Sequence, residues 1–399
     1  MGATIARMTE APIDLLDGDF YADGPYETYA WMREHAPVYW DAQNELWGVS
    51  RYDDIVDVEK RKDVFCSSGG YRPNINADKS IIGLDDPQHA VRRLLVSRRF
   101  TPRAVIEWEP HIRGAVRRML DDALGHGGPV EIVNELAAPL PAMMIGHLLG
   151  FPDELWPSLQ SWSERTIALG GGPRYHNHDG IEAVFEFTAA CMELYESKRS
   201  APADDVMSAW IAAEETGLKD GQDFGLDQII SDCLLLLDGG AETTRTVIAR
   251  TLLNLSSRPD QWQALKDGAD LEVATEEFIR YVTPIHNMCR VATEDALIGD
   301  TVISEGQQVV MMYSSANRDP GHFDDPETLD VRRDPNHHIA FGFGTHFCLG
   351  AALARLEIRL FFEELLERVG HLDLAGKPVE MPNAFVYGLR SVPMTLTPA

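Results

Sequence analysis

Positive charge is scarce in this chain: 35 Lys and Arg residues stand against 63 Asp and Glu residues, which gives a net charge of −28. A chain this acidic is repelled by nucleic acid and by anionic lipid surfaces, so both are excluded as partners. Long apolar runs are also missing, and residues 1–11 lack the basic and apolar regions of a signal peptide. We therefore expect a chain without a membrane anchor or a secretion signal.

Cysteine is rare and scattered. The five cysteines form no Cys-x-x-Cys pair; they are Cys66, Cys191, Cys233, Cys289 and Cys348. An odd number at irregular spacing excludes a disulfide framework, a structural zinc site and a resident iron–sulfur cluster. A glycine-rich dinucleotide fingerprint is absent as well. This cysteine content fits a reducing cytoplasm, where most of the five are expected to be small buried hydrophobic residues.

Helical periodicity is abundant, and 44% hydrophobic residues allow a sizeable core. Helices are predicted over residues 25–35, 87–100, 103–124, 137–149, 181–200, 227–255, 274–282 and 351–369. Short strands are predicted over residues 38–40, 46–50, 288–292, 308–312 and 393–397. The fold class is therefore predicted to be mainly α with small antiparallel β-sheets. Two irregular stretches, residues 66–85 and 170–180, are expected to be lids or binding loops.

The longest predicted helix, residues 227–255, is almost wholly apolar over residues 229–237. A helix this apolar is buried on most sides. Gly239 and Gly240 follow, and each costs about 1 kcal/mol relative to alanine inside a helix. The paired glycines indicate that another group approaches the helix backbone closely at this point.

The segment from Phe341 to Gly350 reads Phe-Gly-Phe-Gly-Thr-His-Phe-Cys-Leu-Gly and precedes a predicted helix. Backbone N–H groups and the helix dipole at that end favour a negatively charged sulfur on Cys348. Gly344 and Gly350 permit positive φ and close approach to a flat group. His346 can donate a hydrogen bond to an anion. Taken alone, a cysteine beside a loop is more often an ordinary core residue.

The complete pattern decides between these interpretations, because it resembles the haem-binding loop of the cytochrome P-450 family at Phe341, Gly344, His346, Cys348 and Gly350. The resemblance extends over nearly the whole chain. It implies a single catalytic domain, residues 1–399, with the cytochrome P-450 fold. It also implies haem b as the cofactor, with Cys348 as the thiolate ligand of the iron.

The resemblance implies a cradle of cations for the two haem carboxylates. His89 and Arg93 lie four residues apart, and Arg290 matches a further propionate-binding position, so with His346 they form the expected donor set. For His89 and Arg93 the alternative is an ordinary surface pair.

A second implied constellation is structural. Glu277 and Arg280 match the family's Glu-x-x-Arg helix motif, and Arg333 matches the third member of that network better than Arg332. These residues are expected to hold the cysteine loop in place. Without the resemblance, Glu277 and Arg280 would be a solvated surface pair worth a few tenths of a kcal/mol.

The glycine pair belongs to a third matching pattern, in which a small residue, glycine, any residue, an acid and threonine follow one another. Here the resemblance implies that Thr243 holds a water or hydroperoxide in a local distortion of the helix. Glu242 is expected to pass protons inward from solvent, and Ala241 is expected at the haem. The alternative is an acid–threonine pair that faces water.

By the same resemblance, the substrate pocket is expected to be mainly apolar and to take a lipophilic molecule. It should draw on residues 170–180 and on Ile81, Ile82, Leu237, Ala241, Thr244, Ile285, Met288, Phe385 and Val386. A polar end of the substrate could be bound by Arg72, His286 or Asn287. Residues 287–290 and 336–350 resemble the corresponding stretches of actinobacterial enzymes that oxidise sterol side chains and branched lipids.

The implied chemistry uses two electrons per turnover, and the sequence shows no electron-carrying extension. We therefore expect a ferredoxin and its reductase as partners. The candidate docking residues, which could equally be solvated helix faces, are Arg92, Arg98, Arg99, Arg103, Arg113, Arg117, Arg118 and Arg355.

The predicted function is a haem-thiolate monooxygenase that inserts one oxygen atom from O2 into a C–H bond of a steroid, terpenoid or branched lipid. One alternative is a peroxide-driven hydroxylase of the same family. Such enzymes lack the acid–threonine pair, so Glu242 and Thr243 weigh against it. The other alternative is a non-catalytic haem or ligand-binding module.

Overall fold

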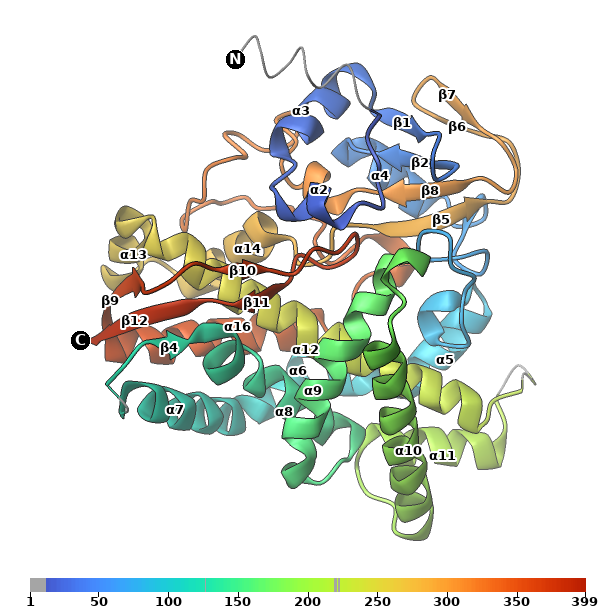
Figure 1. Cartoon of the computed structure of the whole chain (residues 1–399). Helices are drawn as coiled ribbons and strands as arrows, with labels where there is room; N and C mark the ends of the chain where they lie inside the picture. Colours follow the sequence, from blue (N-terminus) through green and yellow to red (C-terminus); the bar gives the residue numbers. More distant parts are fainter. Residues whose placement is uncertain (1–11, 126, 219–220, 222) are drawn as a thin grey trace.

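Helices form most of the structure, and the strands gather in small sheets toward its edges (Figure 1). The computed structural model describes residues 12–125, 127–218, 221 and 223–399. Residues 1–11, where no signal peptide is expected, lie outside this range. The α-helices are α2 (Gly18–Ala22), α3 (Tyr26–His35), α4 (Tyr52–Lys60), α5 (Gln88–Ser97), α6 (Pro102–Val105), α7 (Glu109–Gly125), α8 (Pro139–Leu149), α9 (Trp156–Thr166), α10 (His178–Ser200), α11 (Val206–Thr216), α12 (Leu226–Ser256), α13 (Pro259–Lys266), α14 (Leu271–Val282), α15 (Tyr313–Ala316) and α16 (Ala351–Arg368).

The strands are short. They are β1 (Val38–Asp41), β2 (Leu46–Val49), β3 (Phe65–Cys66), β4 (Val130–Glu131), β5 (Met288–Ala292), β6 (Ala296–Ile298), β7 (Thr301–Ile303), β8 (Gln308–Met311), β9 (Val369–Leu374), β10 (Val379–Glu380), β11 (Leu389–Ser391) and β12 (Pro393–Pro398). The largest sheet has the order β1-β2-β8-β5-β3. Its β2–β8 pair is parallel, with Leu46 opposite Gln308. The prediction of antiparallel sheets alone is therefore wrong for this pair, since strands so far apart in sequence need no hairpin between them.

The predicted helices differ from the structure mainly where local turns interrupt them. The predicted helix over residues 103–124 is divided into α6 and α7 by a 3₁₀ turn at Ile106–Trp108. A π-helix at Ile132–Ala137 precedes α8, which begins at Pro139 because proline suits the first helical turn. The predicted loop over residues 170–180 contains the 3₁₀ turn Pro173–Tyr175 and the start of α10.

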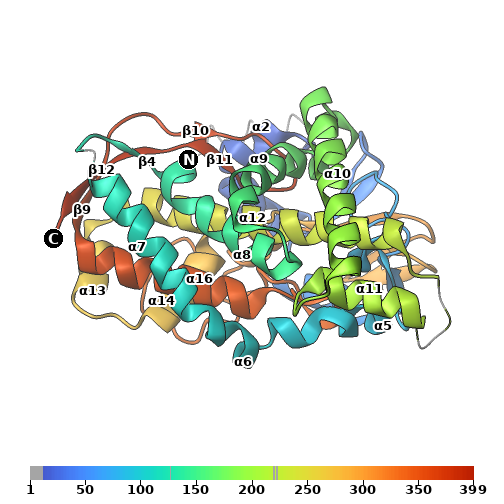
Figure 2. The ribbon, with the colours of Figure 1, turned by 90° about the horizontal axis from the view of Figure 1, so that it is seen from below.

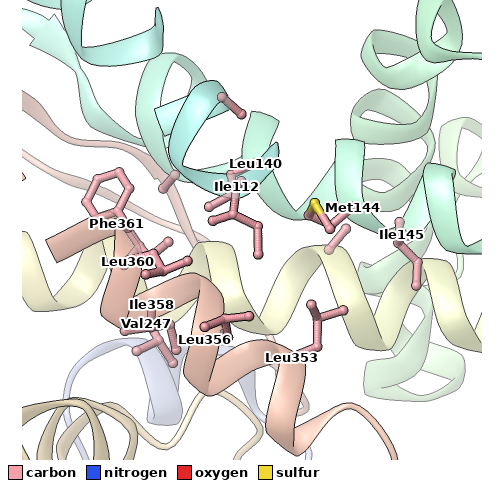
Figure 3. Packing of buried hydrophobic residues seen from close by; sticks show 14 of the residues in the cluster. Ile112, Leu140, Met144, Ile145, Val247, Leu353, Leu356, Ile358, Leu360 and Phe361 are labelled. Carbon is pink, nitrogen blue, oxygen red and sulfur yellow. The ribbon is translucent and has the colours of Figure 1, made fainter. Parts of the chain in front are cut away.

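Helix α12 crosses the molecule, with α9 and α10 on one side and α16 on the other (Figure 2). Side chains from α7, α8 and α16 meet beside it, among them Ile112, Met144 and Leu356 (Figure 3). A side-chain carbon added at Gly240 would lie 3.0 Å from the Ile145 side chain of α8. One of the two paired glycines therefore allows close packing between α8 and α12, which fixes α12 in the core.

One segment of the described residues, Ile132–Leu149, is long and apolar enough to span a membrane by length and composition alone. This contradicts the expectation that the sequence holds no such run. However, 78% of the segment is buried inside the protein. It supplies part of the main hydrophobic core, as a central helix of a water-soluble fold also does.

Candidate active site

Cys348 lies at the end of a tight loop, immediately before α16. Its backbone N–H donates to the Phe341 carbonyl at 2.9 Å, which closes the loop. Gly344 has φ +70°, and a side-chain carbon there would lie 2.8 Å from the Glu59 carbonyl, so only glycine fits. Gly350 has φ −84°, so the predicted positive φ at this position is wrong. An added carbon at Gly350 would meet open space, so this glycine leaves room beside the sulfur.

The surroundings of the Cys348 thiol have opposing effects on its pKa. Burial raises the pKa, while the N–H groups of Gly350 and Ala351 and the cations Arg93 and Arg355 lower it. The net pKa is raised, so the thiol is protonated at neutral pH. A metal cation bound to the sulfur would reverse this, because coordination removes the thiol proton.

The four predicted carboxylate-binding residues lie around this loop. Arg93 donates to the Phe347 carbonyl at 2.5 Å, and the His89 and His346 rings are 4.1 Å apart. His89 Nε2 is buried without a hydrogen-bond partner. Burial, followed by Arg290, lowers the pKa of His346 to about 2. These donors lie close together, and His89 is paired through its other nitrogen with Asp86 at 3.4 Å. Added carboxylates would give the unpartnered donor atoms of this set their acceptors.

Glu59 is a further acid beside this donor set, in addition to Asp86, and sequence reasoning missed it. Its carboxylate lies 3.6 Å from Arg290 and accepts from the Tyr313 hydroxyl at 2.7 Å. Burial raises the pKa of Glu59 to about 7, so it offsets the charge of Arg290 only in part. Nothing in its sequence neighbourhood distinguishes Glu59 from the other acids of α4.

Thr243 lies on the open face of α12. Its hydroxyl donates to the Gly239 carbonyl at 2.7 Å, and a side-chain carbon added at Gly239 would meet open space. Helix α12 is α-helical throughout, so the predicted distortion at Thr243 is absent. The Thr243 hydroxyl bonds to the carbonyl four residues earlier, and the helical hydrogen-bond pattern continues through this position.

Glu242 is buried and paired, rather than open to solvent. It accepts from Arg245 at 2.8 Å and from the Ser163 hydroxyl at 3.3 Å. Arg245 also lies 3.6 Å from Glu164, whose side chain is 36% exposed. Burial raises the pKa of Glu242, and Arg245 acts against that shift. Glu242, Arg245 and Glu164 thus form a charged chain between the interior and the surface.

Three residues assigned to the pocket or the haem lie on another face of α12. Leu237, Ala241 and Thr244 are buried at spacings of four and three residues, in line with the core residue Ile248. At about 100° per residue, this row points away from Gly239 and Thr243. The assignments of Leu237, Ala241 and Thr244 are therefore wrong, because the helix presents them to the hydrophobic core.

The remaining pocket candidates gather on one apolar wall. Ile285, Met288 and Val386 pack in one cluster with Ile167, Met381 and Phe385. A side-chain carbon at Gly170 would lie 2.7 Å from the Phe385 ring, so the segment before α10 lies against the same wall. Ile82 is half-buried, whereas Ile81 belongs to the main core.

Two of the three candidates for a polar end contact other parts of the protein, although His286 Nδ1 and Asn287 Oδ1 have no hydrogen-bond partner. The His286 ring lies 4.4 Å from the Tyr21 ring, and Asn287 donates to the Ala384 carbonyl at 2.8 Å. Arg72 contacts the wall cluster itself, with its Nη1 3.4 Å from the Met288 sulfur.

Glu277, Arg280 and Arg333 lie together. Glu277 and Arg280 are fully buried and 2.7 Å apart, and Arg333 approaches Glu277 at 3.2 Å. Arg280 also donates to the Asn317 carbonyl at 2.7 Å, and Asn336 donates to Glu277 at 3.0 Å. The network joins α14 to the segment that leads into the cysteine loop.

The predicted docking arginines differ in burial and in whether an acidic side chain binds them. Arg92 is buried and paired with Asp232, so its assignment to a docking surface is wrong. Four others bind acidic side chains of this protein: Arg99, Arg113, Arg117 and Arg355. Across the part of the chain that the structure describes, Arg98, Arg103 and Arg118 are exposed and have no acidic partner.

Comparison with known proteins gives one consistent result. Residues 261–394 match the cytochrome P450 family. Steroid C26-monooxygenase of Mycolicibacterium smegmatis is 38% identical over 98% of this chain and 98% of its own length. Linalool 8-monooxygenase of Pseudomonas putida is 32% identical over 96% of this chain and 99% of its own.

Solved structures agree with the sequence relatives. A cytochrome P450 of Mycobacterium marinum in complex with pseudoionone has a TM-score of 0.88 and 32% identity, and covers 96% of this chain and 99% of its own. A Bacillus megaterium protein in complex with testosterone has a TM-score of 0.84 and 33% identity, over 93% and 97% of the two chains. The matches cover nearly the whole chain, including Cys348 and the helix that follows it. This chain belongs to the cytochrome P450 family and is a monooxygenase that uses haem b.

Proposed function

We propose that this enzyme inserts one oxygen atom from O2 into a C–H bond of a lipophilic substrate of the steroid, terpenoid or branched-lipid class. The substrate, O2, two electrons and two protons give the hydroxylated product and water. The observation that carries the proposal is the placement of Thr243 and Gly239 on the open face of α12, next to the buried acid Glu242. A non-catalytic binding module has no use for this arrangement.

Cys348 would hold the haem iron, and Arg93, Arg290, His89 and His346 would bind the haem carboxylates. When bound, a haem with a thiolate ligand supplies the activation of dioxygen. Glu277, Arg280 and Arg333 hold the approach to the cysteine loop and make no contact with the reacting atoms. The role of the protein at the iron is thus to supply the sulfur and to fix its direction.

Glu242 and Thr243, both on α12, would transfer and hold protons for the reaction. Glu242 is held by Arg245, and the exposed part of Glu164 connects this pair to solvent. A swing of the Glu242 carboxyl away from Ser163 would carry a proton inward. The Thr243 hydroxyl, released from the Gly239 carbonyl, can then hold a water at the open face. Proton transfer by a positioned side chain contributes about 10²–10⁴-fold to a rate.

The function is tested with purified haem-loaded enzyme, a surrogate ferredoxin and reductase, and ¹⁸O2. Testosterone, corticosterone, linalool and pseudoionone serve as probes. We expect a product with one ¹⁸O atom from at least one probe. Thr243→Val removes the hydroxyl at constant shape, so it should lower product formed per NADPH consumed by about tenfold or more.

Thr243→Ser is the matched control and should retain most of the coupling between NADPH and product. Equal product from hydrogen peroxide alone, with no gain from the electron donors, would contradict the proposal in favour of a peroxide-driven hydroxylase. Product without ¹⁸O would contradict it outright.

For electrons, we propose a ferredoxin and its reductase, acting in the cytoplasm. Arg98 and Arg103 are exposed and unpaired, and the apolar side chains of Leu94 and Ile106 beside them are 73% and 45% exposed. A mixed basic and apolar patch on an acidic protein favours an acidic partner of matching shape.

Reversal of both charges, Arg98→Glu with Arg103→Glu, should weaken ferredoxin binding about tenfold at low salt. Stopped-flow reduction of the enzyme by ferredoxin measures the change. Arg390→Glu, an exposed substitution in another region, controls for net charge. An equal loss in that variant would refute the assigned patch.

A further inference from the structure

Arg72 is a cation set into an apolar wall. Its guanidinium carbon lies 2.9 Å from the centre of the Phe385 ring, and Nη1 contacts the Met288 sulfur. Within the described ranges, no carboxylate pairs with Arg72 at ion-pair distance. Burial lowers the pKa of Arg72 to about 10, so the group remains charged at neutral pH. Arg72 is half-buried, and a cation held in apolar surroundings without a counter-charge is unfavourable unless a ligand supplies one.

The acid of α12 that acts on Arg72 does not fill this role. Asp238 lies one residue before Gly239 and accepts from, or donates to, the Thr166 hydroxyl at 2.6 Å. That hydroxyl is also 2.8 Å from the Trp162 carbonyl. A hydroxyl has one proton, and the carbonyl can only accept, so a protonated Asp238 satisfies all three groups. Burial raises the pKa of Asp238 to about 8, and the Thr166 hydrogen bond and Arg72 act against that shift without reversing it.

The geometry at Phe385 leaves the hydrogen-bonding edge of Arg72 available. Stacking on a ring uses the face of the guanidinium, whereas its N–H groups point outward in its plane. The Met288 sulfur is a weak acceptor and meets only one of them. The planar fork of an arginine matches a carboxylate with two parallel hydrogen bonds, and this pairing also neutralises the charge. A ketone or hydroxyl would leave the charge unbalanced.

We propose that Arg72 binds the carboxylate of the substrate, and that this enzyme prefers lipophilic carboxylic acids over neutral molecules of the same skeleton. The inference rests on the proposed function, since it names the substrate class of the same pocket. The apolar body would lie against the cluster of Ile285, Met288, Phe385 and Val386. A neutral Asp238 would not repel such an acid. The alternative, an ammonium substrate bound by Asp238, is disfavoured because Arg72 would repel it.

The test compares two acids with their methyl esters: lithocholic acid with methyl lithocholate, and geranic acid with methyl geranate. Dissociation constants are measured on the haem-loaded enzyme by spectral titration and by equilibrium dialysis. We expect at least one acid to bind about tenfold tighter than its ester, as one charge-assisted hydrogen-bond pair provides. Arg72→Leu should abolish that difference and leave ester binding unchanged, while Arg72→Lys should retain part of it.

Arg390→Leu removes the same charge from an exposed site and is the matched control. Circular dichroism and the reduced, CO-bound spectrum establish that each variant is folded and holds haem. The inference would be overturned if acid and ester bind equally tightly to the wild type. It would also be overturned if Arg72→Leu weakens the binding of acid and ester by the same factor. If neutral probes are still converted to ¹⁸O-labelled product, the monooxygenase proposal stands without it.

Discussion

Replacement of Cys348 by alanine should abolish the absorption band of the reduced, CO-bound enzyme for which the cytochrome P450 family is named. The reason is that the sulfur is the proposed axial ligand, and no other side chain of the Phe341–Gly350 loop offers a thiolate. Monooxygenase turnover should fall to background. The measurement is the spectrum of the reduced, CO-bound enzyme minus that of the reduced enzyme, with haem content determined separately by the pyridine haemochrome method.

The matched control is Cys66→Ala, because Cys66 is half-buried like Cys348 but lies in β3. It should keep the complete band. A band that persists in Cys348→Ala would refute the ligand assignment. Cys348→Ser separates ligation from packing, since serine keeps the size of the side chain but is a far weaker ligand.

Replacement of Glu277 by alanine should cause the largest loss of stability. Arg280 has no solvent exposure, and Arg333 is also largely buried, so both cations lose their carboxylate at once. Removal of one member of a buried ion pair costs about 3–5 kcal/mol. We expect a free energy of unfolding lower by that amount in urea denaturation, and release of haem at lower urea than in the wild type.

Asp57→Ala provides the comparison, because it breaks the exposed pair with Arg61 and should cost about 0–1 kcal/mol. Glu277→Gln keeps the shape and some hydrogen bonds of the side chain. Its loss of unfolding free energy should therefore lie between those of Glu277→Ala and Asp57→Ala. If Glu277→Ala costs no more than Asp57→Ala, the three residues do not hold the cysteine loop.

The sequence predicted the features that local pattern controls. Helix α12 was placed to within one residue at each end, because its helical pattern is long and mainly apolar over residues 229–237. The position of Cys348 before a helix followed from the glycines and the helical pattern on either side. These features depend on neighbours in the chain.

The errors concern which way a side chain faces. Leu237, Ala241 and Thr244 were assigned to the pocket from a motif, although their spacing of four and three residues already placed them in one row. Arg92 was read as a surface cation, because its buried partner Asp232 lies on another helix far along the chain. Asp238 carried a visible signal, since it interrupts an apolar stretch just before Gly239. Glu59 carried none.

The parallel pairing of β2 with β8 has a consequence for biosynthesis. Leu46 leaves the ribosome early, but its partner Gln308 is synthesised only after most of the helices. Until then, β2 has an unpaired edge that can bind other chains. Contacts this distant in sequence also slow folding. Recombinant production should therefore give more soluble enzyme when translation is slowed by low temperature or when chaperones are co-expressed.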